Sequence, residues 1–317
     1  EEVTNEENSS SNKTFELRLT EIIQEMAKVL AEKARDVETP LDIQEISQAV
    51  SALSHNPKYV TIKSRDLLLE ALEVALSFED IELTGSTPNF VLVGLSNMVT
   101  LIKSTDLPEL ESDNDGKDND QDDDGNEEDS NKYDLYDAID RLIENLWRRF
   151  RSNGLSIEIV TPNIQVSFVR RKPENATLSC FPLPTDGEKR DLSSANTPRG
   201  CLKMPSEYLE SFNDSCSNGT SSMIDSKAVN KNYNKYQSID DVKLNSAVND
   251  YALAQGCFSS PSSGNKSSEL KVSNLEDPAG LAVITEDPNL TTTEDKKVLT
   301  CIFWDISTRT WDREGCK

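Results

Sequence analysis

Hydrophobic residues recur at three- and four-residue spacing through the first half of the chain, the period of helices that bury one face. This pattern predicts five amphipathic helices, over residues 15–30, 40–53, 64–76, 89–103 and 133–150. Five such helices joined by short turns predict a helical bundle over residues 14–154. The first helix has an apolar stripe, its expected buried face, made of Phe15, Leu19, Ile22, Ile23, Met26, Val29 and Leu30.

Cap signals mark the starts of two of these helices. Thr39 is a candidate N-cap, because Pro40 follows it at the first helical position and Asp42 falls in the first turn. Ser64 is the candidate cap of the third helix.

Two polar segments interrupt the helical pattern. Residues 1–13 are polar and charged, and predict a flexible lead-in. Residues 109–129 hold twelve acidic residues and one lysine. Like charges at this density repel one another, so we expect a disordered acidic insert over residues 109–131.

After Asn153-Gly154 the period of the pattern changes from about 3.6 to 2, which indicates strands. The first two strands contain Leu155, Ile157 and Ile159, then Ile164, Val166 and Phe168. Further strands are predicted over residues 176–180, 269–272, 281–285 and 298–304.

Residues 185–265 are rich in Ser, Asn, Gly and Lys and show weak periodicity, so we expect poorly ordered excursions held at intervals by disulfides. Helices come first and strands second, which predicts an α+β fold and not an alternating α/β fold. We expect an antiparallel β-sandwich subdomain over residues 155–317, ending in segment 298–317.

The formal net charge of −24 argues against binding to nucleic acid and to anionic lipid. No stretch approaches the roughly 18 apolar residues that a membrane helix needs, so we expect the chain to be soluble. It begins without a basic, apolar signal segment, and we therefore expect that a leader was removed or that the numbering starts at a cut end.

Cysteines and glycosylation sequons together favour the secretory route. All six cysteines are candidates for disulfides and follow residue 179: Cys180, Cys201, Cys216, Cys257, Cys301 and Cys316. Seven Asn-x-Ser/Thr sequons predict N-linked glycans, at Asn8, Asn12, Asn175, Asn213, Asn218, Asn265 and Asn289.

Candidate catalytic and metal-binding residues are scarce. The one histidine, His55, stands at a predicted helix end beside Asn56-Pro57, where a surface turn is expected, and hydrolytic triads and multi-histidine metal sites need a well-placed imidazole. Asp120, Asp122 and Asp124 match the opening of an EF-hand loop, but Asn131 replaces its final glutamate. We therefore predict no catalytic or metal site, with weak Ca²⁺ association of the acidic insert as the remaining cofactor hypothesis.

The end of the chain, "CIFWDISTRTWDREGC" at residues 301–316, carries the most specific pattern. Its spacing resembles the opening half of the GPS motif, which ends the GAIN domain of adhesion-type G-protein-coupled receptors and of the polycystin and egg-jelly-receptor family. Helices followed by strands also resemble the GAIN arrangement. Seven positions match: Cys301, Phe303, Trp304, Asp305, Trp311, Gly315 and Cys316.

The resemblance implies a self-cleaving bond beyond Lys317, where a histidine acts as base and a Thr or Ser hydroxyl attacks the preceding carbonyl. None of those residues is in this sequence, so we predict that the chain is not an enzyme. In the family, Cys301 and Cys316 would pair with two later cysteines. In this chain they are unpaired, paired with each other, or bonded to a segment outside the sequence.

We therefore expect an extracellular, juxtamembrane GAIN-like domain of a large cell-surface receptor, which holds a cleaved or cleavable stalk for adhesion or mechanical signalling. Its expected partners are its own C-terminal membrane-spanning portion or a released stalk segment, and an extracellular protein ligand. The alternative is a non-cleaving adhesion or structural glycoprotein of the cell surface or matrix. A secreted hydrolase is disfavoured by the lack of a nucleophile motif.

Overall fold

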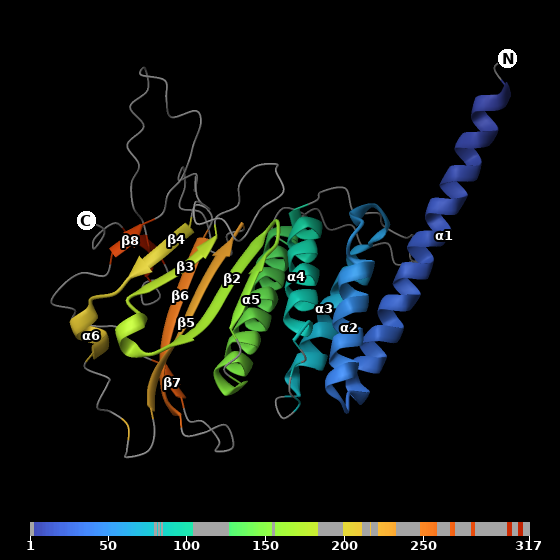
Figure 1. The fold of residues 1–317 in the computed structure, drawn as a ribbon. Coiled ribbons are helices and arrows are strands. Elements are labelled where there is room, and N and C mark those ends of the chain that lie inside the picture. Colours follow the sequence, from blue (N-terminus) through green and yellow to red (C-terminus); the bar gives the residue numbers. More distant parts are fainter. Residues whose placement is uncertain are drawn as a thin grey trace, which may run out of the picture.

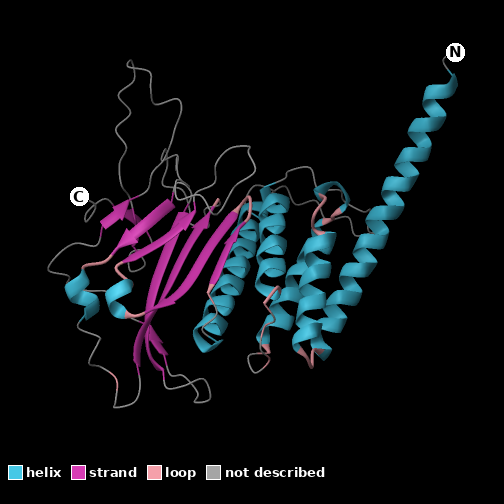
Figure 2. Cartoon of the chain, viewed as in Figure 1, coloured by secondary structure: helices cyan, strands magenta, loops and turns pink. Residues whose placement is uncertain are grey.

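A computed structural model of the chain has helices first and antiparallel sheets second, which confirms the predicted α+β class (Figures 1 and 2). The structure describes residues 3–78, 81, 83, 85–103, 127–153, 156–182, 199–210, 216, 221–232, 248–258, 267–269, 280–282, 303–305 and 310–312.

The helices stand side by side, with α5 next to the sheet and α1 at the outer edge of the bundle (Figure 1). Contacts are most extensive between α1 and α3 and between α2 and α4, so the bundle is built in pairs. The helices are α1 (Val3–Lys33), α2 (Pro40–Leu53), α3 (Ile62–Ser77), α4 (Thr87–Lys103), α5 (Glu127–Asn153) and α6 (Ser206–Glu210), with short 3-10 turns η1 (Ala34–Asp36), η2 (Pro57–Tyr59) and η3 (Pro173–Asn175).

The start of α2 follows the predicted chemistry. Thr39 Oγ1 accepts a hydrogen bond from the backbone N–H of Asp42, and the Asp42 carboxylate accepts one from the N–H of Thr39, which completes a capping box. Thr39 Oγ1 also donates a hydrogen bond to the Asp42 carboxylate, and this bond, with those from the backbone N–H groups of Glu38 and Thr39, holds the pKa of Asp42 below its ordinary value. The predicted cap of α3 was wrong: Thr61 is the N-cap, and Ser64 donates its N–H to Thr61 Oγ1 from the first turn.

Two helices extend into segments that the sequence assigned otherwise. Helix α1 begins at Val3, so residues 3–13 are helical and not a flexible lead-in. Helix α5 begins at Glu127, so residues 127–131 belong to it and not to the acidic insert. Adding residues to an existing helix is far less costly than starting one, and acidic residues near an N-terminus favour such extension. The rest of the insert lies outside the described residues.

The buried face of α1 is narrower than its apolar stripe. Small residues on α1 pack against the bundle, and Ala27 and Ala31 are buried together with Ile23. The predicted inward positions Phe15, Ile22, Met26 and Val29 are exposed. Alanine lets α1 approach α3 closely, so the larger residues of the stripe lie to one side of the contact.

The main sheet has five antiparallel strands in the order β1-β2-β5-β6-β7. A three-stranded sheet, β3-β4-β8, and a two-stranded one, β9-β10, complete the described strands. Their bounds are β1 (Ile157–Val160), β2 (Ile164–Arg171), β3 (Leu178–Pro182), β4 (Arg199–Lys203), β5 (Ser221–Lys231), β6 (Val248–Phe258), β7 (Ser267–Glu269), β8 (Gly280–Ala282), β9 (Phe303–Asp305) and β10 (Thr310–Asp312).

The prediction of poorly ordered excursions over residues 185–265 was wrong where the two longest strands, β5 and β6, lie. β5 and β6 pair over eleven positions, from Ser221 opposite Phe258 to Lys231 opposite Val248. β4 and α6 also fall in this region. The pattern concealed β5 because three of its inward positions carry charges.

One hydrophobic core joins the bundle to the sheet. Phe168 of β2 packs on Trp147 and Phe150 of α5, with ring centroids 5.2 Å and 5.8 Å away. Such aromatic clusters supply much of the apolar area that a core buries. A smaller hydrophobic core lies on the opposite face of the main sheet. It includes Ile224 of β5, Leu253 of β6 and Met204, which directly follows β4.

Candidate functional site

The contact between the main sheet and α5 contains buried charges in addition to the aromatic core. Arg170 of β2 lies opposite Asp225 of β5 in the sheet register. Arg170 Nε donates to Asp225 Oδ1 at 2.5 Å and its Nη2 donates to Oδ2 at 2.8 Å, a two-pronged ion pair. The same guanidinium donates to the backbone oxygen of Arg151 at the end of α5, so it links the sheet to the helix.

Burial governs the titration of Asp225, whose side chain is inaccessible to solvent. Burial raises the pKa of Asp225 above its ordinary 3.8, and the hydrogen bonds and charge of Arg170 offset only part of that rise. The ionised pair is therefore costly to bury, and breaking it would leave an uncompensated charge.

Two lysines of β5 continue the charged contact with α5. Lys227 Nζ lies 3.0 Å from Glu144 Oε2 of α5 and 3.1 Å from Asp250 Oδ2 of β6. Lys231 Nζ lies 2.7 Å from Asp140 Oδ1, one turn earlier on α5. Each lysine therefore bridges helix and sheet.

The pKa of Lys227 records both burial and pairing. Burial lowers the pKa of Lys227, but the charges of Asp250 and Glu144 outweigh it and hold the pKa above 10.5. A raised lysine pKa stabilises the folded state below the unfolded value and loses that contribution as the pH rises through the folded value. The pair therefore contributes throughout the physiological pH range.

A neutral polar contact fastens the turn between β1 and β2 to α4. Asn163 Nδ2 donates to the Ser96 backbone oxygen at 2.9 Å and to Thr100 Oγ1 at 2.8 Å. The backbone N–H of Asn163 also donates to Ser96 Oγ at 3.1 Å. These hydrogen bonds from one buried asparagine fix the start of the sheet on the bundle.

The GPS-like segment forms a small antiparallel ladder. Trp304 of β9 lies directly opposite Trp311 of β10, and Phe303 lies opposite Asp312. Among the described strands, β9 and β10 pair with each other and with neither of the larger sheets. Phe303 and Trp304, the last two residues of the predicted strand over residues 298–304, fall in β9, and residues 298–302 lie outside the described residues. The motif residues Cys301, Gly315 and Cys316 lie outside the described residues.

No known protein-family model matches this sequence, and no curated protein sequence matches it. A solved structure similar to the chain is the full extracellular region of zebrafish Gpr126/Adgrg6. The similarity has a TM-score of 0.46 and 14% sequence identity, and it covers 90% of this chain and 33% of that chain. This chain thus spans about a third of that extracellular region.

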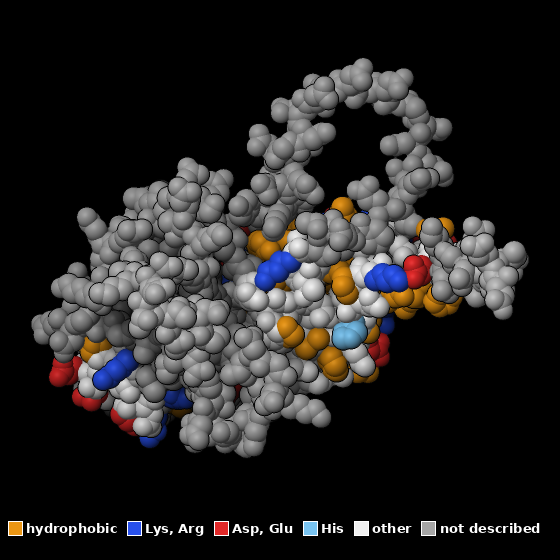
Figure 3. Space-filling model, turned by 90° about the horizontal axis from the view of Figure 1, so that it is seen from above, with side chains coloured by type: hydrophobic (Ala, Val, Ile, Leu, Met, Phe, Trp, Pro, Cys, Tyr) orange, Lys and Arg blue, Asp and Glu red, His pale blue; other side chains and the backbone are white. Residues whose placement is uncertain are grey.

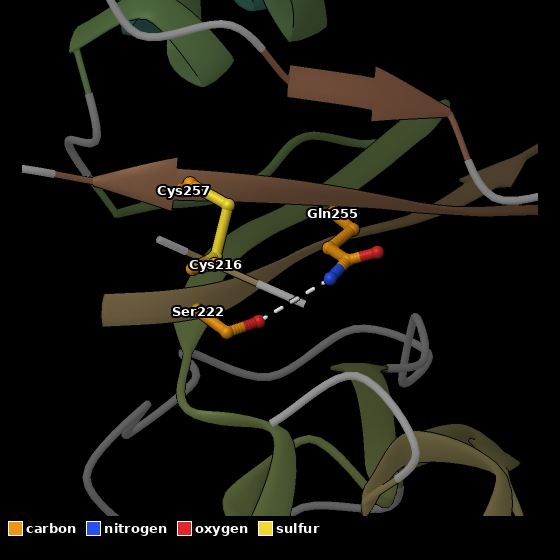
Figure 4. Close-up of a disulfide and its surroundings, with 4 residues drawn as sticks. All are labelled: Cys216, Ser222, Gln255 and Cys257. Carbon is orange, nitrogen blue, oxygen red and sulfur yellow. Dashed lines mark hydrogen bonds between the residues drawn. A yellow bond between two sulfur atoms is a disulfide. The ribbon is translucent and has the colours of Figure 1, made fainter. Parts of the chain in front are cut away.

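Two of the six candidate cysteines are bonded to each other in the described part of the chain. Cys216 and Cys257 form a disulfide with Cα atoms 5.5 Å apart, which joins the segment before β5 to the end of β6 (Figure 4). The neighbouring Gln255 Nε2 donates to Ser222 Oγ at 3.4 Å. The covalent bond therefore closes the end of the longest strand pair.

The sheet register predicts a second disulfide. Cys180 of β3 and Cys201 of β4 occupy directly opposite positions. Opposite Cα atoms in an antiparallel ladder are about 4.5–5.5 Å apart, within the range that a disulfide spans. Non-reducing peptide mapping should recover one peptide pair joined through these two cysteines.

The Cys216–Cys257 peptide serves as the internal control for that map. A bond from Cys180 to any cysteine other than Cys201 would contradict the prediction. If both bonds are present and no thiol is free, Cys301 and Cys316 bond either each other or cysteines outside this sequence, and a bond between the two would differ from the pairing that the GPS resemblance implies.

Among the predicted glycosylation sites, Asn175 is the best defined. It ends η3 and is exposed, so an oligosaccharide could be attached there without unfolding the chain. Asn8 and Asn12 lie in α1. Asn213, Asn218, Asn265 and Asn289 lie outside the described residues.

The other chemical candidates give no assembled centre in the part of the chain that the structure describes. His55 is exposed in the turn between α2 and η2, as expected. Groups of three or more His, Cys, Asp or Glu side chains that could hold a metal ion are not found among the described residues. Of the helices described, none combines the length and hydrophobicity that a membrane span requires.

Proposed function

We propose that this chain is the GAIN-like, extracellular juxtamembrane part of a large cell-surface receptor of the polycystin or adhesion-receptor type. The observation that carries the proposal is the pairing of β9 with β10, because it joins Trp304 and Trp311 of the GPS-like segment in one ladder. The matching residue spacing at 301–316 and the order of helices before sheets support the same proposal.

The proposed role is mechanical and organisational. Ion pairs from the buried Lys227 and Lys231 of β5 to α5 and a shared aromatic core join the bundle to the sheet, so a pull applied to one would be transmitted to the other. The partners would be the receptor's own C-terminal membrane-spanning portion, or the stalk segment released from it, and an extracellular protein ligand. The chain would need no cofactor beyond N-linked glycans, with weak Ca²⁺ association of residues 109–131 as a secondary effect.

The experiment expresses the complete natural reading frame in animal cells, with one tag before residue 1 and one beyond residue 317, on the far side of the bond that the GPS resemblance implies. Surface biotinylation should label the protein, and removal of N-glycans should increase its mobility in gels. Asn175→Gln should remove one glycan step, whereas Asn56→Gln, at an exposed asparagine outside any sequon, should leave the mobility unchanged. An intracellular, unglycosylated product would contradict the proposal.

Protein from the same cells also distinguishes a cleaving receptor from the alternative, a non-cleaving glycoprotein. Under denaturing conditions, cleavage gives two fragments with one tag each, and under native conditions both tags should be recovered together. A single full-length band at the cell surface would reject the cleaving receptor and favour the non-cleaving glycoprotein.

A further inference from the structure

Helix α1 carries large hydrophobic side chains that the bundle does not cover. Phe15, Ile22 and Val29 are 64%, 53% and 58% exposed, and Met26 is 47% exposed. We call these four residues the α1 stripe. Figure 3 shows hydrophobic side chains gathered on the right of the molecule, the side on which α1 forms the outer edge of the bundle in Figure 1. Large exposed hydrophobic residues that cluster usually mark an interaction surface.

The spacing of the stripe identifies the kind of surface. Phe15, Ile22 and Val29 repeat every seven residues, and Met26 follows Ile22 by four, so all four share one side of the helix. The positions that pack on the bundle, such as Ile23 and Ala27, are buried on an adjacent side. A continuous apolar row at this spacing fits the side of another helix.

We propose that the α1 stripe docks on the α1 stripe of a second copy of this chain, antiparallel, with a two-fold axis at Ile22. In this arrangement Ile22 meets its own counterpart, and Phe15 lies opposite Val29 of the second copy. A two-fold interface requires such self-complementarity, because the same patch serves both partners.

The charges beside the stripe favour the antiparallel direction. Arg18 and Glu25 are exposed and flank Ile22 on the outer side of the stripe. About a two-fold axis at Ile22, Arg18 of one copy comes next to Met26 and Glu25 of the other. The arginine stem can then cover the methionine while its guanidinium meets the carboxylate. A parallel pair would instead set Arg18 against Arg18 and Glu25 against Glu25.

The position of α1 leaves room for this contact. Its buried face is directed at α3, and no element of the described chain lies beyond it on the outer edge of the bundle (Figure 1). Near the end of α1, Lys33 pairs with Glu45 at 3.0 Å, and the exposed Leu41 lies one helical turn before Glu45. Leu41 is therefore an exposed apolar residue of α2 near the C-terminal end of α1.

Sedimentation equilibrium of the full chain tests the proposal. The wild-type chain should dimerise below about 100 µM, and Ile22→Glu should raise the dissociation constant about a hundredfold, because it places two carboxylates at the axis. Leu17→Glu is the matched control: Leu17 is exposed to a similar extent but lies about 140° around the helix. Both positions are exposed, so the thermal unfolding midpoint of each variant should match the wild type when it is measured well below the wild-type dissociation constant, where every form is monomeric.

Charge reversal tests the direction of the pair. Arg18→Glu and Glu25→Arg should each weaken the dimer about tenfold, and the double variant should recover the wild-type constant. A parallel dimer would show no recovery, which would overturn the proposed arrangement. A monomeric wild-type chain, as would result if another segment occupied the stripe, or a dimer unaffected by Ile22→Glu, would overturn the proposal as a whole.

Discussion

Asp225→Asn is expected to lower the free energy of unfolding by about 3–5 kcal/mol, because it leaves the Arg170 guanidinium buried without its counter-charge. The loss should be measured by urea unfolding at neutral pH, followed by circular dichroism. It should be accompanied by an unchanged slope of the free energy against urea if the folded state keeps its compactness.

A double variant separates the cost of an unpaired charge from the value of the pair. The raised pKa of Asp225 indicates that burial costs the carboxylate more than Arg170 returns. Arg170→Met combined with Asp225→Leu should therefore recover most of the stability. Glu70→Gln is the control: it removes the exposed pair with Arg35 and should change stability by less than about 1 kcal/mol. Equal losses of stability in Asp225→Asn and in Glu70→Gln would contradict the burial argument.

Removing the Cys216–Cys257 disulfide is expected to cost about 4 kcal/mol. The two cysteines are 41 residues apart, and the bond restricts the unfolded chain over that whole loop. The variant Cys216→Ser with Cys257→Ser should therefore unfold at lower urea concentration than the wild type. The comparison is made without reducing agent.

Two controls assign that loss to the covalent bond. Under full reduction the wild type and the double serine variant should have the same stability. Ser222→Ala removes the side-chain hydrogen bond beside the disulfide and should have a small effect, about 1 kcal/mol or less. If the two proteins still differed in stability under reduction, the loss would be due to packing at the two positions and not to the covalent bond.

The bundle could be predicted from the sequence because its helices follow rules of local chemistry. Thr39, Pro40 and Asp42 specify the start of α2 within four residues, and the structure has the complete capping box there. The faces of α3, α4 and α5 follow their apolar periodicity for the same reason. The residue types and their spacing along the chain were therefore sufficient to predict these helices.

Strand β5 could not be predicted in this way. Its inward positions are Asp225, Lys227, Val229 and Lys231, and charged residues at three of four such positions erase the alternation that marks a half-buried strand. Those charges are neutralised by Arg170 and by α5, whose Glu144 is 83 residues away. A pattern search over neighbouring residues has no access to partners at that distance.

The same distinction applies to the candidate site: the part that depends on local spacing was predicted, and the part that depends on distant residues was not. The GPS-like segment was found from spacing alone, and Phe303, Trp304, Asp305 and Trp311 do fall in two paired strands. The contact of α5 with the sheet was missed, because its members come from three distant elements. Hydrophobic periodicity correctly placed the residues of the α1 stripe on one side of the helix, but the prediction that this side is buried was wrong. Periodicity shows which residues share a side of a helix and not what lies against that side.

The charged contact also sets an order of events during synthesis. The ribosome adds Glu144 83 residues before Lys227, a delay of roughly 4–17 s at ordinary elongation rates. Helical bundles with local contacts complete their folding within microseconds to milliseconds. When β5 leaves the ribosome, α5 is therefore expected to be folded already, so that its Asp140 and Glu144 are available to pair with the lysines of β5 before β6 emerges.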